Sequence, residues 1–121
     1  MEQLGLFEKK DLPKLKFDDD LTNQERDILA TIPQGLDNPI PLSEICERLG
    51  LERRTVNNTI NHLIMEHGFL IGGIRSGSHP GYFIINSKDG LEQATRPLKN
   101  QAINMLRRIE TLEKIGNVTL N

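Results

Sequence analysis

The stretch LSEICERLGLERRTVNNTINHLIMEHG, residues 42–68, predicts two helices joined by a very tight turn. Ile45 and Leu49 lie four residues apart on the apolar side of the first helix. Gly50 follows at the position where a left-handed residue commonly ends a helix. The second helix is predicted from about residue 52 to residue 67, so only about three residues separate the two. This is the spacing of a helix-turn-helix.

The ends and the packing of these two helices are also indicated by residue type. Ser43 is the expected N-cap of the first helix, and Gly68 is expected to close the second. The second helix carries an amphipathic apolar set that we expect to pack inward against the first. That set is Val56, Ile60, Leu63 and Ile64.

The opposite face of the second helix has an unusual composition. It bears arginines and asparagines, although a solvated helix face favours Lys, Glu and Gln and asparagine has poor helix propensity. Arginine forms bidentate hydrogen bonds with guanine or phosphate, and asparagine pairs with adenine in the major groove. Thr55 and Thr59 also suit phosphate or the thymine methyl group. We therefore predict a DNA-reading face rather than a solvated face of chance composition: Arg53, Arg54, Thr55, Asn57, Asn58 and Asn61.

A β-hairpin is predicted directly after this helix. FLIGGI (69–74) and YFIIN (82–86) favour strands, and the residues between them have the composition of a turn. Small residues at the tip would let it lie close to a sugar-phosphate backbone. The predicted backbone contacts are Arg75, Ser76, Ser78 and His79.

Residues 42–85 resemble a winged helix-turn-helix domain, most of all the DNA-binding domain of the biotin operon repressor and related phage proteins. The resemblance lies in the Leu49–Gly50 helix ending, the R-x-V-x-x-x-I-x-x-L pattern from Arg54 to Leu63, and the Gly81–Tyr82 strand opening. It implies a mainly α fold with a small β-hairpin and sequence-specific binding to double-stranded DNA. The whole chain also resembles small proteins encoded near replication or early-control genes in phages of Gram-positive bacteria.

The chain departs from that family in two respects. Its net charge is −2, whereas DNA-binding members are often basic, so binding is expected to be weak or to need a dimer. The enzymatic domain of the biotin repressor has no counterpart here, so no ligase activity is expected.

Three segments are predicted along the 121 residues. Residues 1–20 form a polar, partly disordered arm, or an arm that docks Leu12, Leu15 and Phe17 on a neighbouring subunit. Residues 21–86 form the winged helix-turn-helix domain, which opens with a capping box at Thr22 and a helix ending before Pro33. The QGLDNPIP stretch that follows is predicted to be a loop.

Residues 87–121 form the predicted C-terminal helical segment. Pro97 costs about 3 kcal/mol inside a helix, so a break or kink is expected near Arg96. Apolar residues recur at heptad spacing, which favours a homodimer over packing back onto the small domain, with a larger bundle as an alternative. The predicted dimer contacts are Leu91, Leu98, Ala102, Met105, Ile109 and Leu112.

No metal-binding, catalytic or cofactor site is expected elsewhere in the sequence. His62 and His67 lie five apart, about 140° around a helix, so they are predicted to be surface histidines and not a metal pair. Cys46, the single cysteine, is predicted to be a small core thiol, and Asp18–Asp20 to complement a helix dipole. No catalytic motif, cofactor motif, membrane span or signal peptide is recognisable. The prediction is a cytoplasmic protein without enzymatic activity, cofactor or metal.

The sequence features allow three functions to be compared. The leading hypothesis is a dimeric, sequence-specific double-stranded DNA-binding protein, acting as a transcriptional regulator or a phage replication or early-control factor. The alternative is a winged-helix adaptor that binds a host replication or defence protein without DNA, which the acidic balance suits. A single-stranded DNA accessory protein is disfavoured, because only 4% of residues are aromatic and stacking platforms are missing.

Overall fold

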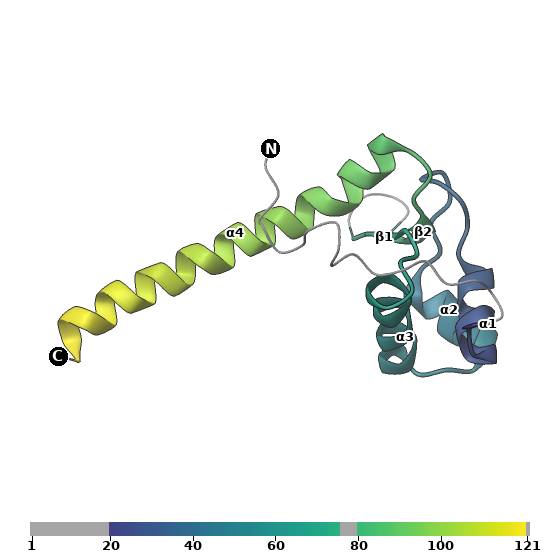
Figure 1. Ribbon diagram of the computed structural model, residues 1–121, viewed down its shortest axis with the longest axis horizontal. Coiled ribbons are helices and arrows are strands. Elements are labelled where there is room, and N and C mark those ends of the chain that lie inside the picture. The colour runs from purple at the N-terminus through teal and green to yellow at the C-terminus, as the bar shows by residue number, and fades with distance from the viewer. Residues whose placement is uncertain (1–19, 76–79, 121) are drawn as a thin grey trace.

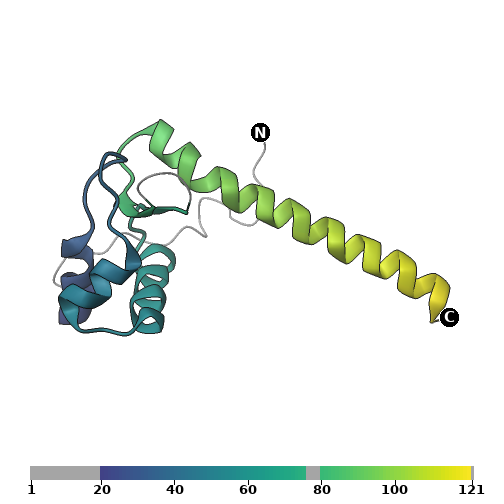
Figure 2. The same ribbon diagram turned by 180° about the vertical axis from the view of Figure 1, so that it is seen from behind.

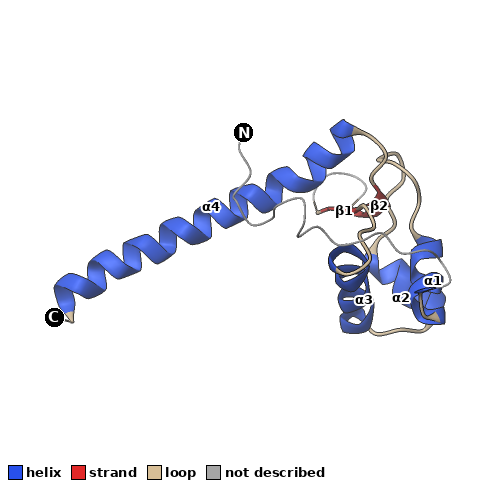
Figure 3. Cartoon of the chain, viewed as in Figure 1, coloured by secondary structure: helices blue, strands red, loops and turns tan. Residues whose placement is uncertain are grey.

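The computed structural model describes residues 20–75 and 80–120, and this part is mainly α-helical with one small hairpin (Figures 1 and 3). The predicted mainly α class is confirmed. Apart from Asp20, the expected N-terminal arm lies outside the described residues. The elements in chain order are α1 (Asn23–Thr31), α2 (Leu42–Leu49), α3 (Arg53–Met65), β1 (Ile71–Ile74), β2 (Gly81–Ile84) and α4 (Lys88–Thr119).

Helix α1 begins with the predicted capping box. The Glu25 amide donates to Thr22 Oγ1 at 3.1 Å, and the Thr22 amide donates to Glu25 Oε1 at 2.8 Å. These two bonds satisfy amides that a helix start leaves free. Only one carboxylate oxygen of Glu25 is used in this way, and the other, Oε2, lies near His62 and His67.

The turn between α2 and α3 is as tight as the sequence indicates. Gly50 has a φ of 66°, in the left-handed region that glycine adopts without a Cβ clash. The Leu51 amide donates back to the Cys46 carbonyl at 3.1 Å, which closes the end of α2. The chain is thereby turned sharply, and α3 packs across both α1 and α2.

The start of α2 corrects one prediction. Ser43 is not the N-cap: the N-cap of α2 is Pro41, two residues earlier, and the helix begins at Leu42. Pro41 holds an extended conformation at φ −63° and ψ 147°, and its carbonyl accepts the Glu44 and Ile45 amides at 3.0 and 3.2 Å. The fixed φ of proline suits this position, so no side-chain cap is needed.

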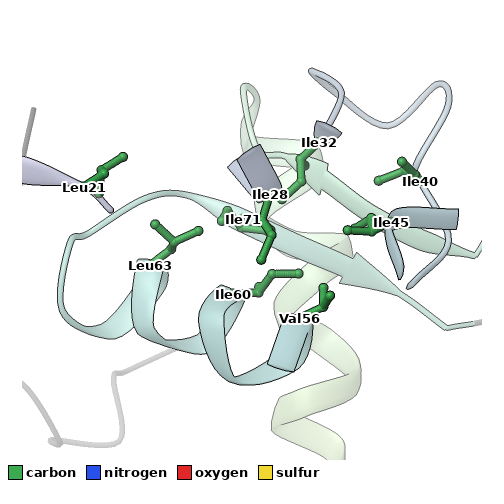
Figure 4. Close-up of a cluster of buried hydrophobic side chains, with 9 residues drawn as sticks. All are labelled: Leu21, Ile28, Ile32, Ile40, Ile45, Val56, Ile60, Leu63 and Ile71. Atoms are coloured by element: carbon green, nitrogen blue, oxygen red, sulfur yellow. The ribbon is translucent and has the colours of Figure 1, made fainter. Parts of the chain in front are cut away.

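One hydrophobic core joins the three helices to the hairpin (Figure 4). Ile28, Ile45, Val56 and Leu63 are fully buried within it, so each helix contributes its apolar stripe. The large number of branched side chains and the near absence of aromatics follow from the composition. The buried members are Leu21, Ile28, Ile32, Ile40, Ile45, Val56, Ile60, Leu63 and Ile71.

Strand β2 is paired on both sides. Ile71 pairs with Ile84 and Ile74 with Gly81 in the antiparallel hairpin. On the other edge, Ile40 and Tyr82 exchange two backbone hydrogen bonds, each 2.8 Å long. The segment before α2, which the sequence indicated only as a loop, therefore pairs with the second edge of β2 and fixes the hairpin against the helices.

Helix α4 covers the hairpin and then extends away from the rest of the molecule (Figures 1 and 2). Its start is capped by Ser87, whose Oγ accepts the Gly90 amide at 3.0 Å. Gly90 and Ala94 are buried, and Ala94 belongs to a second cluster with Phe83 and Ile85. None of the described helices combines the length and hydrophobicity needed to cross a bilayer.

The predicted break near Arg96 is wrong, because α4 runs unbroken through Pro97. Proline has a φ that is itself helical, so only the missing N–H and the contact with the preceding turn must be accommodated. Pro97 is exposed, and the exposed face of a helix accommodates such a change more easily than a packed one. The helix continues to Thr119.

Candidate nucleic-acid interface

Helix α3 separates its two faces as predicted. Val56, Ile60 and Leu63 are at most 2% exposed and face the core. The other side of the helix is exposed to solvent. Its residues are Arg53, Arg54, Asn57, Asn58 and Asn61.

Most side chains on this exposed face have no partner in the described part of the chain. Neither Arg53 nor Arg54 forms an ion pair there, and Asn58 and Asn61 make no side-chain hydrogen bond. No acidic residue lies in the first turn of α3, although Glu52 is its N-cap residue. The guanidinium and carboxamide groups are therefore available to an external ligand.

The two threonines of α3 are less available than the sequence indicated. Thr55 is half-buried, and the Thr59 hydroxyl donates to the Thr55 carbonyl at 2.8 Å. Hydroxyls of helical threonines commonly bond to the preceding turn in this way. Thr55 is consequently a weaker candidate for contact than the arginines and asparagines.

Tyr82 connects the hairpin to α3. Its hydroxyl donates to Asn57 Oδ1 at 2.8 Å, across 25 residues of sequence. This bond occupies the carbonyl oxygen of Asn57 and leaves its amide hydrogens available. The Gly81–Tyr82 pair indicated a strand opening, but its contact with α3 depends on the pairing of β2 and was not predictable from the sequence.

Two arginines lie close to the Tyr82 phenol. Burial raises the pKa of Tyr82 above its ordinary value, although the charges of Arg75 and Arg53 act in the opposite direction. The phenol is thus neutral at physiological pH and remains a hydrogen-bond donor. Arg75 from the hairpin and Arg53 from α3 accordingly lie on the same side of the molecule.

A groove between α3, the hairpin and the start of α4 contains this polar cluster. Arg53, Asn57, Asn61, Arg75 and Tyr82 line one part of it. The predicted tip residues Ser76, Ser78 and His79 lie outside the described residues. The structure therefore brings the predicted α3 face and Arg75 together.

The predicted dimer contacts lie along α4 and are uncovered in the single chain. Met105 is 57% exposed and Leu112 61% exposed, far above what is usual for large apolar residues. Leu91, Leu98 and Ile109 are exposed as well, and Ala102 is half-buried.

The prediction of two surface histidines is wrong for His67, which is only 3% exposed, whereas His62 is exposed. The prediction assumed a helix continuing through His67, but α3 ends at Met65. The Gly68 amide donates to the Ile64 carbonyl at 3.2 Å, and the turn directs His67 inward. Both histidines lie near Glu25 of α1.

No known protein family, curated protein or solved structure matches this chain.

Proposed function

We propose that this chain is a winged helix-turn-helix protein that binds double-stranded DNA sequence-specifically. It would act as a cytoplasmic dimer, as a transcriptional regulator or as a phage replication or early-control factor. The exposed Arg/Asn face of α3, free of internal ion pairs in the described part of the chain, is the observation that carries this proposal. The order of three helices and a hairpin, with α3 following a tight turn, supports it.

In this proposal α3 lies in the major groove. Arg54 and Asn58 are four residues apart and exposed on one face, where each can form a bidentate contact with a base edge. Arg75 and the hairpin contact the neighbouring backbone. The Tyr82–Asn57 hydrogen bond fixes the hairpin relative to α3, so both contacts are presented together.

Helix α4 would form the dimer. Its 32 residues span about 48 Å, and no residue beyond Pro97 belongs to either hydrophobic cluster of the described domain. Leu98, Met105 and Leu112 fall on d positions of a heptad pattern, with Ala102 and Ile109 on a positions. An apolar seam of this length would be buried by a second copy of the same helix.

Charges flanking this seam favour a parallel pair. Arg108 falls on a g position, and Glu113 falls on the e position of the next heptad. In a parallel two-stranded coil these two positions on opposite helices face each other. Neither residue forms an ion pair within the described part of the chain, so both are available to the partner helix.

The charge pattern gives a test of the dimer. Arg108→Glu places two glutamates opposite each other on both sides of the seam, and should raise the dissociation constant about tenfold. Adding Glu113→Arg restores the attraction and should return the constant toward the original. Sedimentation equilibrium measures each variant. If the original protein is monomeric, the dimer is contradicted, and a larger assembly contradicts the two-stranded coil. If Arg108→Glu leaves the dissociation constant unchanged, the parallel orientation is contradicted.

Selection from a random duplex pool tests DNA recognition. We expect enrichment of an inverted repeat, since a two-fold dimer reads two half-sites. Affinity for the enriched site should fall steeply as salt rises from 50 to 200 mM, because phosphate contacts release counterions. Failure to enrich any motif, with no mobility shift at micromolar protein and low salt, would rule out sequence-specific binding.

A protein-interaction adaptor is the second candidate. Its support is the net charge of −2 and the apolar part of the groove, where Leu70, Ile74 and Leu98 line the wall beside α4. Such a surface suits an apolar protein segment better than a phosphate backbone. Specific retention of one host replication or defence protein, together with no DNA shift, would favour this function.

A further inference from the structure

Glu25 of α1, His62 of α3 and His67 of the following turn form a cluster that the proposed function does not use. Glu25 Oε2 lies 3.5 Å from His62 Nε2 and 3.3 Å from His67 Nε2. The three ligand atoms all lie within 4.8 Å of one another. The two imidazole rings are arranged edge to face, with centroids 5.0 Å apart.

The carboxylate is fixed in this cluster by the start of α1. Thr22 binds one oxygen, Oε1, through its amide, which leaves Oε2 directed at both histidines. Burial by itself raises the pKa of Glu25, but the hydrogen bonds from Thr22 and the charges of His67 and His62 outweigh it. The pKa of Glu25 consequently lies below its ordinary value.

The burial of His67 in this cluster is energetically unfavourable for its Nδ1 atom. It is 3% exposed, and its Nδ1 is buried without a hydrogen-bond partner in the described part of the chain. A buried polar atom without a partner is unfavourable, so an interaction at the other ring nitrogen must offset it. That other nitrogen, Nε2, is the one that faces Glu25.

The two printed separations from the Glu25 oxygen fit a tetrahedral metal ion. Two donor atoms held about 2.1 Å from a tetrahedral zinc ion lie roughly 3.4 Å apart. Both distances to the Glu25 oxygen agree with that separation. Two imidazoles and one carboxylate are also ligands that zinc accepts, and the exposure of His62 leaves a fourth position for water.

We propose that Glu25, His62 and His67 bind a divalent transition-metal ion of the zinc class, which links α1 to the C-terminal end of α3. The link spans 42 residues of sequence between Glu25 and His67 and joins two helices that pack against each other. The inference does not depend on DNA binding, and its test uses none.

Titration calorimetry of the full chain with zinc sulfate tests the site. We expect one ion per chain, and a rise in melting temperature on the order of 10 °C when free zinc is a hundred times its dissociation constant. A chelator should reverse the rise, and magnesium should not produce it, because magnesium prefers an octahedral set of oxygens.

Variants at the exposed ligand separate this site from chance zinc binding. His62→Ala should lower zinc affinity at least tenfold while circular dichroism shows the original helix content. His62→Cys should retain affinity, since a thiolate is also a zinc ligand. Equal zinc affinity in His62→Ala and the original protein, or no zinc binding by the original protein, would overturn the site.

Discussion

Replacing Gly81 with alanine should destabilise the domain by roughly 2–6 kcal/mol, through backbone strain and a direct clash. Gly81 has a φ of 152°, a backbone conformation that residues other than glycine rarely adopt. A Cβ at this position would lie 2.4 Å from the carbonyl carbon and oxygen of Ile40. Ile40 backbone atoms cannot retreat without losing both hydrogen bonds to Tyr82.

Gly73→Ala is the matched control, since Gly73 lies in the facing strand of the same hairpin. Its added Cβ would meet only Tyr82 ring atoms, at 3.5 Å and beyond, which is ordinary contact. We expect a change below about 1 kcal/mol for this variant. Urea unfolding followed by circular dichroism measures the stability of both variants. An equal loss of stability in the two would show that the close approach of Ile40 is not what restricts position 81 to glycine.

Removing Arg54 and Asn58 together should abolish recognition of the selected DNA site. Each bidentate base contact contributes about 1–3 kcal/mol of discrimination, so the double alanine variant should lose roughly 2–6 kcal/mol. That corresponds to a reduction of about thirtyfold or more in the preference for the site over a scrambled duplex. Both side chains are exposed, so the fold should be unaffected.

The measurement is a titration of labelled duplexes at fixed salt, since affinities at different salt concentrations cannot be compared. Arg107→Ala is the control: it removes the same charge from an exposed position on α4, and the preference for the site should persist. If the Arg54→Ala/Asn58→Ala variant selects the same site with equal affinity, α3 does not read the bases.

Local residue patterns were sufficient to predict several elements. The capping box at Thr22, the left-handed turn at Gly50 and the apolar spacing of Val56, Ile60 and Leu63 each depend on interactions within a few residues. Such interactions are encoded by neighbouring side chains, so they can be inferred from the sequence. The exposed polar face of α3 follows from the same spacing.

Several predictions failed, for different physical reasons. Pro97 was expected to break the last helix, yet α4 continues through it on an exposed face. His67 was expected at the surface, yet the end of α3 at Met65 turns it inward. The sequence predicts a loop at Ile40, yet this residue pairs with Tyr82 of β2.

By itself, the sequence determined where the first three helices lie, the capping box at Thr22, the tight turn and the polar face of α3, because these arise from contacts between residues close in the chain. Only the tertiary structure placed Tyr82 against Asn57 and gathered Glu25, His62 and His67 at the α1–α3 contact. Tyr82 lies 25 residues from Asn57, and Glu25 lies 37 and 42 residues from the two histidines, so these groups come together only when the core closes. Their proximity depends on packing between elements, which no local pattern specifies.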